Sequence, residues 1–365
     1  MRIAFDHQIF CRQSYGGISR YIVEIANEMS SYNDVAIFSP VYVNEYLDNL
    51  SDKIMLSGIK VPRFPYTGSL YSHLGDILSP LMIRKFRPNI VHETYYSSHK
   101  SYPKDARIVI TVHDMIHEIL PQFFRSWDNT SQHKKTTILR ADHIICVSEN
   151  TKNDLMNFFD VKSEKITVVP HGFSFKKVTA HRNEFQININ RPFILFVGDR
   201  SKYKNLYNFL KAFSSSRLLK EFNVVFFGGG YATDDDISLL RSLNIPRDCI
   251  SFVSGDDDAL QLHYKMASFF VYPSLYEGFG MPLLEAMSMG CPVACSNTSS
   301  IPEVVGAAAL MFNPNDVDSI RNVMEIISSD SVVRETLVNE GARQIKKFSW
   351  QKSAAETLSV YRKII

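Results

Sequence analysis

The sequence predicts an α/β protein of two domains, each a doubly wound parallel sheet with helices on both faces. Three observations support this fold class. The chain has 365 residues, 45% of them hydrophobic, which favours two cores over one. Short runs of β-branched and other apolar residues alternate with amphipathic segments. The alternation is lost over residues 173–190 and then begins again. Two units of similar design joined by a linker account for this pattern.

The first domain, residues 1–172, contains six apolar runs that predict strands. The runs are continuous rather than alternating, which is typical of strands covered by helices on both faces. Amphipathic stretches at 17–30 and 71–86 predict two of the intervening helices. The six runs are MRIAF (1–5), VAIFSP (35–40), NIVHET (89–94), RIVITVHD (107–114), HIICVS (143–148) and KITVVPHG (165–172).

The second domain, residues 191–349, repeats the pattern after the linker. Its predicted strands are FILFVGD (193–199), NVVFFGGG (223–230), CISFVSG (249–255), SFFVYPS (268–274) and CPVACSN (291–297). Helical patterns occupy 204–216, 235–243, 257–267, 282–289 and 316–328. In doubly wound sheets, ligands bind beyond the carboxyl ends of the strands. The loops that follow these runs are therefore where functional residues should be sought.

Composition narrows the class of protein further. The formal net charge is +2, and residues 1–172 carry 19 Lys and Arg against 18 Asp and Glu, so no basic region indicates nucleic acid. Five cysteines in mostly apolar surroundings indicate reduced, buried thiols. The N-terminus does not resemble a signal peptide, and no apolar run approaches the roughly 18 residues of a membrane span. We expect a soluble, cytoplasmic protein.

Two glycine- or cation-containing loops are candidate anion sites. YGGIS (15–19) opens a helix, where Gly16 and Gly17 let backbone amides approach an anion; a tight strand-to-helix turn is the alternative. In VGDRSKYKN (197–205), Arg200 and Lys204 lie beside the start of a helix. Two cations there oppose the helix dipole unless an anion lies between them. The pair indicates a diphosphate site or, alternatively, a solvated surface pair.

The segment LYEGFGMPLLE (275–285) places two glutamates around a helix start. Pro282 suits the first turn, so the amides of Gly280, Met281 and Leu283 are predicted to point out of the helix N-terminus. A phosphate there, with Glu277 and Glu285 accepting hydrogen bonds from neighbouring hydroxyls, would use both carboxylates. The alternative for Glu285 is a capping or surface residue.

These segments, in this order, resemble the retaining glycosyltransferases of family GT4, which have the GT-B fold of two Rossmann-like domains facing across a cleft. Glu-x7-Glu is the most characteristic motif. The resemblance runs along almost the whole chain, through GGISRY, HETYY (92–96), TVHDMI (111–116), ICVSENTKNDL (145–155), VVPHG (168–172) and the stretch 290–314. It also leads us to expect a C-terminal helix, about 350–365, that packs on the N-terminal domain.

The resemblance implies a role for each candidate. Family members move a sugar from a nucleotide diphosphosugar to an acceptor hydroxyl, without a metal or other cofactor. By resemblance, Arg200 and Lys204 bind the diphosphate, Glu277 holds the sugar hydroxyls and Glu285 the ribose diol. Gly16 and Gly17 close on the phosphates. His113 lies against the donor sugar; for His113 alone, a structural pair with Asp114 is the alternative. The remaining donor-binding residues are Val253, in the loop that holds the base, and Gly278, Phe279, Gly280, Met281 and Leu283.

The resemblance is to the mannosyltransferase-like branch of bacterial O-antigen and capsule synthesis. It implies GDP-mannose as the donor, with UDP-sugars as the alternative, and a lipid-linked acceptor, such as an undecaprenyl-diphosphate glycan. A lipid-linked acceptor in turn implies that the protein contacts the inner face of the plasma membrane peripherally. Arg84, Lys85 and Arg87 on an apolar-faced segment, and Lys134 and Lys135, give this mild support. The same architecture allows three alternative functions: a non-catalytic subunit that binds a sugar nucleotide, an epimerase or a phosphorylase.

Two further groups of residues could suggest other chemistry. Asp234–Asp236 and Asp256–Asp258 resemble metal-binding carboxylates, but each precedes a helical pattern, where acidic residues meet the dipole favourably. We expect helix starts and no metal site. His92, His99 and His171 lie near strand ends, where they either line the acceptor side or are structural.

Overall fold

The computed structural model describes residues 1–64, 67–98, 102–175 and 191–365. The chain divides into two compact units: unit 1 comprises residues 1–172 with 348–365, and unit 2 comprises residues 173–347. Most of the predicted linker, and His99 among the candidate residues, lie outside the described residues.

Unit 1 is built on a parallel sheet, seven-stranded in the described residues. The order reverses in the middle, where β1 pairs with both β2 and β4. All positions of β4 and β6 are buried, as expected for strands covered on both faces. Across the sheet the strands are β3 (Met55–Lys60), β2 (Asp34–Tyr42), β1 (Arg2–Phe5), β4 (Ile90–Glu93), β5 (Arg107–Val112), β6 (His143–Cys146) and β7 (Ile166–Val168).

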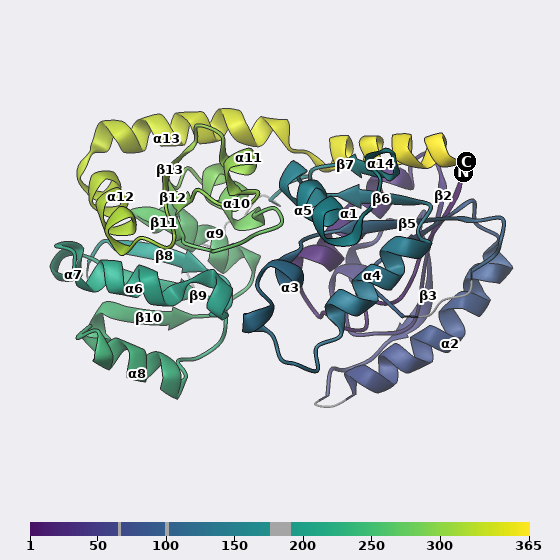
Figure 1. Ribbon diagram of the computed structural model, residues 1–365, viewed down its shortest axis with the longest axis horizontal. Helices are drawn as coiled ribbons and strands as arrows, with labels where there is room; N and C mark the ends of the chain where they lie inside the picture. The colour runs from purple at the N-terminus through teal and green to yellow at the C-terminus, as the bar shows by residue number, and fades with distance from the viewer. Residues whose placement is uncertain (65–66, 99–101, 176–190) are drawn as a thin grey trace. The chain divides into compact units, whose positions relative to one another are not determined.

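Helices pack on both faces of the first sheet (Figure 1). The helix α14 belongs to this unit although it closes the chain: it packs along α1, and the Tyr361 hydroxyl lies 2.6 Å from Nδ1 of His92 on β4. The helices are α1 (Gly17–Met29), α2 (Gly68–Phe86), α3 (Ile116–Ile119), α4 (Thr130–Arg140), α5 (Glu149–Phe159) and α14 (Trp350–Ile364).

Unit 2 repeats the architecture with a six-stranded parallel sheet. Its order reverses between β8 and β11, and phenylalanines such as Phe196, Phe209 and Phe226 stack in the core beneath it. The strands across the sheet are β10 (Ile250–Val253), β9 (Asn223–Phe227), β8 (Phe193–Val197), β11 (Phe269–Tyr272), β12 (Val293–Ser296) and β13 (Ala309–Phe312). The helices are α6 (Leu206–Ser214), α7 (Leu218–Glu221), α8 (Asp234–Ser242), α9 (Asp257–Met266), α10 (Met281–Ser288), α11 (Ile301–Val305), α12 (Val317–Ser329) and α13 (Ser331–Gln344).

The predicted fold class is confirmed, and each of the eleven apolar runs named above contains a strand. Two strands escaped prediction, β3 and β13, and both lie at the edge of a sheet. Edge strands need not be apolar on both faces, and every residue of β3 is exposed or half-buried. The continuous apolar pattern that predicts a central strand is therefore missing from β3.

Candidate active site

The two candidate loops of unit 2 meet at the point where the second sheet reverses its strand order. One loop follows β8 and the other follows β11, and these strands are neighbours. The loops are joined directly, because the Leu275 amide donates to the Tyr203 carbonyl at 2.8 Å. The buried Asn205 side chain also donates to the Pro273 carbonyl at 3.1 Å. Residues 68 and 72 positions apart are thus held side by side at the usual ligand-binding edge of such a sheet.

This junction brings Lys204 and Glu277 together as an ion pair. Nζ of Lys204 lies 2.7 Å from Oε1 of Glu277, with the Tyr272 hydroxyl at 3.3 Å. The two side chains are 12% and 13% exposed. Burial alone would lower the pKa of Lys204, but the Glu277 carboxylate, together with Tyr272 and Tyr203, outweighs burial and holds that pKa well above its usual value. Lys204 is therefore a fixed positive charge at the strand ends.

Two serines fix the loop that carries Glu277. The Ser299 hydroxyl accepts a hydrogen bond from the Glu277 amide at 2.9 Å, and Ser300 donates to the Glu277 carbonyl at 2.8 Å. Ser300 also donates to the carbonyl of the buried Phe279 at 3.2 Å. Sequence reasoning missed these positioning residues. The signal available was the pair's place directly after β12, the strand beside β11.

The second glutamate, Glu285, is buried on α10, so a surface role is wrong. Its carboxylate accepts a hydrogen bond from the Tyr264 hydroxyl at 3.1 Å, and that hydroxyl also lies 3.2 Å from the Pro282 carbonyl. Tyr264 comes from α9, so Glu285 is held by a neighbouring helix. Sequence reasoning did not identify Tyr264.

The start of α10 has the glycine turn that the motif predicts. Gly280 has φ +110°, a backbone angle that requires glycine, and a Cβ there would also lie 2.7 Å from Leu283 Cδ1. One expectation needs correction: the Leu283 amide donates to the Gly280 carbonyl at 3.0 Å and does not point out of the helix. Among the three predicted amides, those of Gly280 and Met281 stay candidates for an anion.

Arg200 is held by a carboxylate and several backbone carbonyls that sequence reasoning did not identify. Nε of Arg200 lies 3.1 Å from Oδ2 of Asp236. Its remaining donors reach the carbonyls of the glycine loop after β9, including Gly229 at 3.0 Å and Tyr231 at 2.7 Å. The guanidinium also lies 5.0 Å from the Phe252 ring centroid. The described contacts of Arg200 thus join the loop after β8 to the loop after β9, to α8 and to strand β10, whereas Lys204 joins the loop after β8 to the loop after β11.

The acidic runs begin helices, as predicted. Asp236 forms a capping box with Thr233 at the start of α8, and Asp256 accepts the Ala259 amide at 2.9 Å at the start of α9. Within the described residues, no group of three or more His, Cys, Asp or Glu side chains is arranged to hold a metal ion.

Val253, the candidate for the base-binding loop, is the last residue of β10. Its carbonyl accepts a hydrogen bond from the Gly228 amide at 2.9 Å.

In unit 1, His113 follows β5 and stacks on His171, the histidine of VVPHG. The rings are 5.4 Å apart and 6° from parallel, and Tyr21 lies edge-on to both. Burial lowers the pKa of His113 to about 3 and that of His171 well below its usual value. Both imidazoles are therefore neutral at physiological pH. The Asp114 carboxylate accepts a hydrogen bond from the Ile116 amide at 3.1 Å and lies 3.8 Å from Nζ of Lys134, so these contacts do not support a His113–Asp114 pair.

Two other unit 1 residues have structural roles. His92 is fully buried between the Tyr361 hydroxyl and Thr111 Oγ1, at 2.6 and 2.9 Å. Lys134 is fully buried and donates to Glu118 at 2.7 Å, which corrects its expected place among surface cations.

The two candidate glycines lie at the start of α1. Gly16 is the N-cap residue of this helix, and a Cβ there would lie 2.3 Å from Gln13 Oε1, which accepts a hydrogen bond from the Ser19 amide. Gly17 is exposed.

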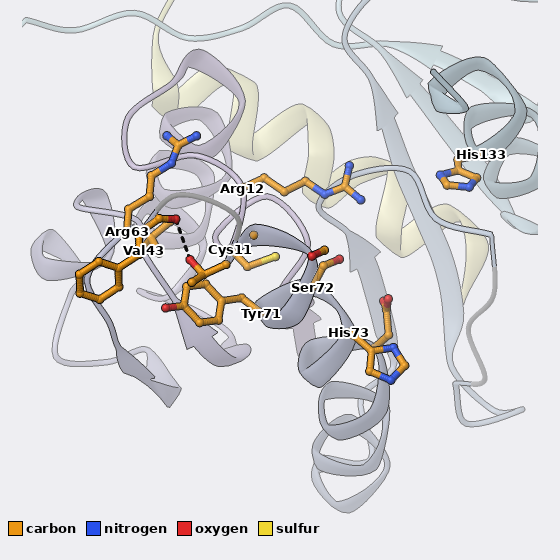
Figure 2. Close-up of a pocket in the computed structure, with 13 residues that line it drawn as sticks. Cys11, Arg12, Val43, Arg63, Tyr71, Ser72, His73 and His133 are labelled. Atoms are coloured by element: carbon orange, nitrogen blue, oxygen red, sulfur yellow. Dashed lines mark hydrogen bonds between the residues drawn. The ribbon is translucent and has the colours of Figure 1, made fainter. Parts of the chain in front are cut away.

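A cavity of about 880 Å³ opens in unit 1 where the segment after β1 meets the start of α2 (Figure 2). Arg12 and Arg63 contribute guanidinium groups, and Tyr71, Ser72 and His73 contribute polar atoms from α2. In the described part of the chain, neither arginine forms an ion pair or hydrogen bond; Arg12 lies 5.3 Å from the Tyr95 ring centroid. Sequence reasoning did not identify this cavity.

Comparison with known proteins matches a glycosyltransferase model to each half of the chain. Residues 15–177 match the description "Glycosyltransferase Family 4", and residues 177–344 match "Glycosyl transferases group 1". The chain is 26% identical over 370 residues to O-antigen chain mannosyltransferase B of Escherichia coli, covering 95% of this chain and 96% of that protein.

Solved structures share the fold. Sucrose-phosphate synthase of Thermosynechococcus elongatus matches with a TM-score of 0.77 at 18% identity, over 100% of this chain and 98% of that one. Anabaena HepE in complex with UDP and glucose matches with a TM-score of 0.73 at 17% identity, over 98% of this chain and 99% of that one. The two models together cover residues 15–344, so the chain is a glycosyltransferase, an enzyme that transfers a sugar, with a family 4 domain, a group 1 domain and the GT-B fold of two parallel-sheet units.

Proposed function

We propose that this protein is a retaining, metal-independent mannosyltransferase that moves mannose from GDP-mannose to a hydroxyl of a lipid-linked glycan in O-antigen or capsule synthesis. The observation that carries the proposal is the buried Lys204–Glu277 pair at the strand-order reversal of unit 2. A relative named an O-antigen mannosyltransferase, aligned over 95% of this chain, supports the choice of mannose.

The diphosphate of the donor is assigned to the cationic edge of unit 2. Lys204 supplies a positive charge that its raised pKa keeps at neutral pH. Arg200 is the second cation, and the amides of Gly278, Phe279, Gly280 and Met281 would line the phosphate and sugar site. Charge that develops on the departing diphosphate is stabilised by donors already in place. A metal ion is not needed for this role.

The remaining donor groups are assigned to the carboxylates and to β10. Glu277 would hold sugar hydroxyls while it keeps Lys204 charged. Glu285, fixed by Tyr264, would accept hydrogen bonds from the ribose diol. The loop after Val253 would hold the base through its backbone. UDP-sugars stay the alternative donors, since the solved HepE complex contains UDP and glucose.

His113 is assigned to the sugar rather than to the phosphates. A neutral imidazole, held parallel to His171, can accept or donate a hydrogen bond without placing positive charge beside a glycosidic carbon that itself becomes positive. Gly16 and Gly17 begin α1 in the same unit and would approach the phosphates with their amides.

The unit 1 cavity is assigned to the acceptor. Its two guanidinium groups have no acidic partner in the described residues, so they suit a phosphate-bearing acceptor. Arg63→Gln should raise KM for a diphosphate-linked acceptor and leave KM for GDP-mannose unchanged, whereas equal changes in both constants would contradict this assignment.

A thermal-shift panel tests the donor assignment. A nucleotide at one hundred times its Kd adds about 2.7 kcal/mol to the native state. GDP and GDP-mannose should raise Tm more than UDP, UDP-glucose or ADP. If no nucleoside diphosphate raises Tm, the proposed transferase function is contradicted. If UDP raises Tm more than GDP does, the donor is a UDP-sugar rather than GDP-mannose. Release of GDP only when acceptor is added excludes a non-catalytic subunit.

A further inference from the structure

The Arg200 side chain has as many acceptors within the protein as it has donors. A guanidinium group carries five N–H donors, one on Nε and two on each terminal nitrogen. Nε of Arg200 donates to Oδ2 of Asp236 at 3.1 Å. Nη1 and Nη2 reach the four consecutive carbonyls of the glycine loop, residues 228–231, at 3.2, 3.0, 3.4 and 2.7 Å in chain order. A phosphate could therefore gain an N–H of Arg200 only by displacing one of these acceptors.

The glycine loop depends on Arg200 for its shape. Its three glycines have φ +90°, +69° and +76°, a run of left-handed conformations that glycine adopts without strain and also leaves easily. Gly229, Gly230 and Tyr231 are exposed, so packing does not fix them. The Arg200 side chain is 7% exposed and contacts every carbonyl of the loop. It supplies the constraint that packing does not.

Asp236 in turn anchors the guanidinium. Its carboxylate is 10% exposed and also accepts hydrogen bonds from the Thr233 amide and hydroxyl, each at 2.8 Å. These bonds belong to the capping box that begins α8. Opposite charges that are paired and hydrogen-bonded can be held in such a poorly hydrated place. Arg200 therefore joins the glycine loop to the first turn of a helix.

The glycine loop borders the segment assigned to the base of the donor. It follows β9, whose neighbour is β10, and the Gly228 amide donates to the Val253 carbonyl at 2.9 Å. The Arg200 guanidinium also lies 5.0 Å from the ring centroid of Phe252 on β10. The loop and the end of β10 thus lie side by side at the carboxyl edge of the sheet, where such folds bind nucleotides.

We propose that Arg200 is a positioning residue: it holds the glycine loop as one wall of the nucleoside pocket beside Val253, and it donates no N–H to the diphosphate. This role differs from direct binding of the diphosphate, which the resemblance implies. Arg200 keeps its place as the second cation of the edge, but it acts on the phosphates through space. The inference rests on the proposed function, in which the loop after Val253 holds the base.

Three single variants separate positioning from direct binding. Arg200→Lys keeps the charge but has three donors on one nitrogen in place of a planar fork of five. Gly229→Ala keeps Arg200, but the added Cβ would lie 2.7 Å from Nη1 and would push the guanidinium off the loop. The matched control is Gly230→Ala. Its φ of +76° carries similar backbone strain, and no atom of the described residues lies within 4 Å of the added Cβ.

Calorimetric titration of the full chain with GDP measures the effect. Arg200→Lys should bind GDP about tenfold more weakly than wild type, as for a loop that has its binding shape about one tenth of the time. Gly229→Ala should bind GDP at least about fivefold more weakly than Gly230→Ala, because only Gly229→Ala displaces Arg200. Inorganic pyrophosphate, which has no base or ribose, should compete with GDP for wild type and both variants at the same Kd. In the free chain, the Gly228 amide should exchange with deuterium faster in Arg200→Lys and Gly229→Ala.

Three results would overturn the inference. The first is wild-type GDP affinity in Arg200→Lys. The second is tighter GDP binding by Gly229→Ala than by wild type, which would mean that a released guanidinium binds the phosphates. The third is an equal loss of affinity for GDP and pyrophosphate, which would assign the contact to the diphosphate.

The inference and the proposed function fail separately. If the variants bind GDP as predicted but the wild-type chain transfers no sugar from any nucleotide sugar, the proposed function fails and the role of Arg200 stands. If the wild-type chain transfers mannose and the variants bind GDP like wild type, the role of Arg200 fails and the proposed function stands.

Discussion

Replacing Glu277 by Gln removes the negative member of a buried ion pair and keeps its size. Lys204 would retain one neutral hydrogen bond, plus the Tyr272 hydroxyl at 3.3 Å, in place of a carboxylate at 2.7 Å. Its ammonium group is then a buried charge without a counter-charge in the described residues around it. We expect the variant to be less stable, slower in transfer and undiminished in nucleotide binding.

The magnitude follows from the geometry. Unit charges 2.7 Å apart at an effective dielectric constant of about 20 interact by about 6 kcal/mol. Desolvation offsets part of this energy, and breaking a buried pair costs about 3 to 5 kcal/mol. Because the two side chains are 12% and 13% exposed, the lower value applies. A cost of about 3 kcal/mol in a unit of this size lowers Tm by about 6 to 12 °C.

The assay combines calorimetry with transfer on the same preparation. GDP brings negative charge to the unpaired ammonium, so Glu277→Gln should bind GDP at least as tightly as wild type and gain more Tm from it. Transfer should fall at least a hundredfold, because sugar hydroxyls lose their acceptor. The control Glu340→Gln removes one member of an exposed pair with Arg343 and should cost less than about 1 kcal/mol. An unchanged Tm together with lost GDP binding would refute the reasoning.

The other predictions concern binding, chemistry, metal and pH. Lys204→Ala should weaken both GDP binding and transfer; loss of transfer alone would remove its phosphate role. His113→Ala should bind GDP nearly as wild type but transfer at least about a hundredfold more slowly, and near-normal transfer would make His113 structural. EDTA should leave transfer largely intact, whereas loss restored by manganese would indicate a metal site. Burial lowers the pKa of His92 to about 3, against about 6.5 unfolded, so the unfolded chain binds more protons between these values. Stability should fall as pH drops through that window, by about 2 kcal/mol for His92 at pH 5, and Tm of His92→Gln should depend less on pH.

The central strands of both sheets and the Glu277 loop were predictable because their determinants are local. Continuous apolar runs identify central strands, and a glycine turn followed by Pro282 identifies a helix start. The partners of the site residues were not predictable in this way. Tyr264 reaches Glu285 from another helix, Ser299 follows a different strand, and Asp236 lies 36 residues from Arg200. Such contacts depend on strand order, which local patterns do not specify.

The apolar face of α2 shows a different limit. The segment 71–86 was correctly predicted as a helix, and its basic end was noted. Periodicity predicts that one stripe is apolar, but the structure determines which side of a helix faces the sheet. Small residues, Gly75 and Ser79, face inward here, and large aliphatic residues face outward. That inversion is visible only once β2 and α2 are packed together.

The central claim, retaining transfer of mannose from GDP-mannose, is tested most directly by the anomeric configuration of the product. GDP-α-mannose with a radiolabelled sugar is incubated with undecaprenyl-diphosphate-linked oligosaccharide in EDTA, and the labelled glycan is digested with α- or β-mannosidase. We predict label in the glycan that α-mannosidase releases and β-mannosidase does not. Release by β-mannosidase, or label incorporated from UDP-sugars and not from GDP-mannose, would contradict the account.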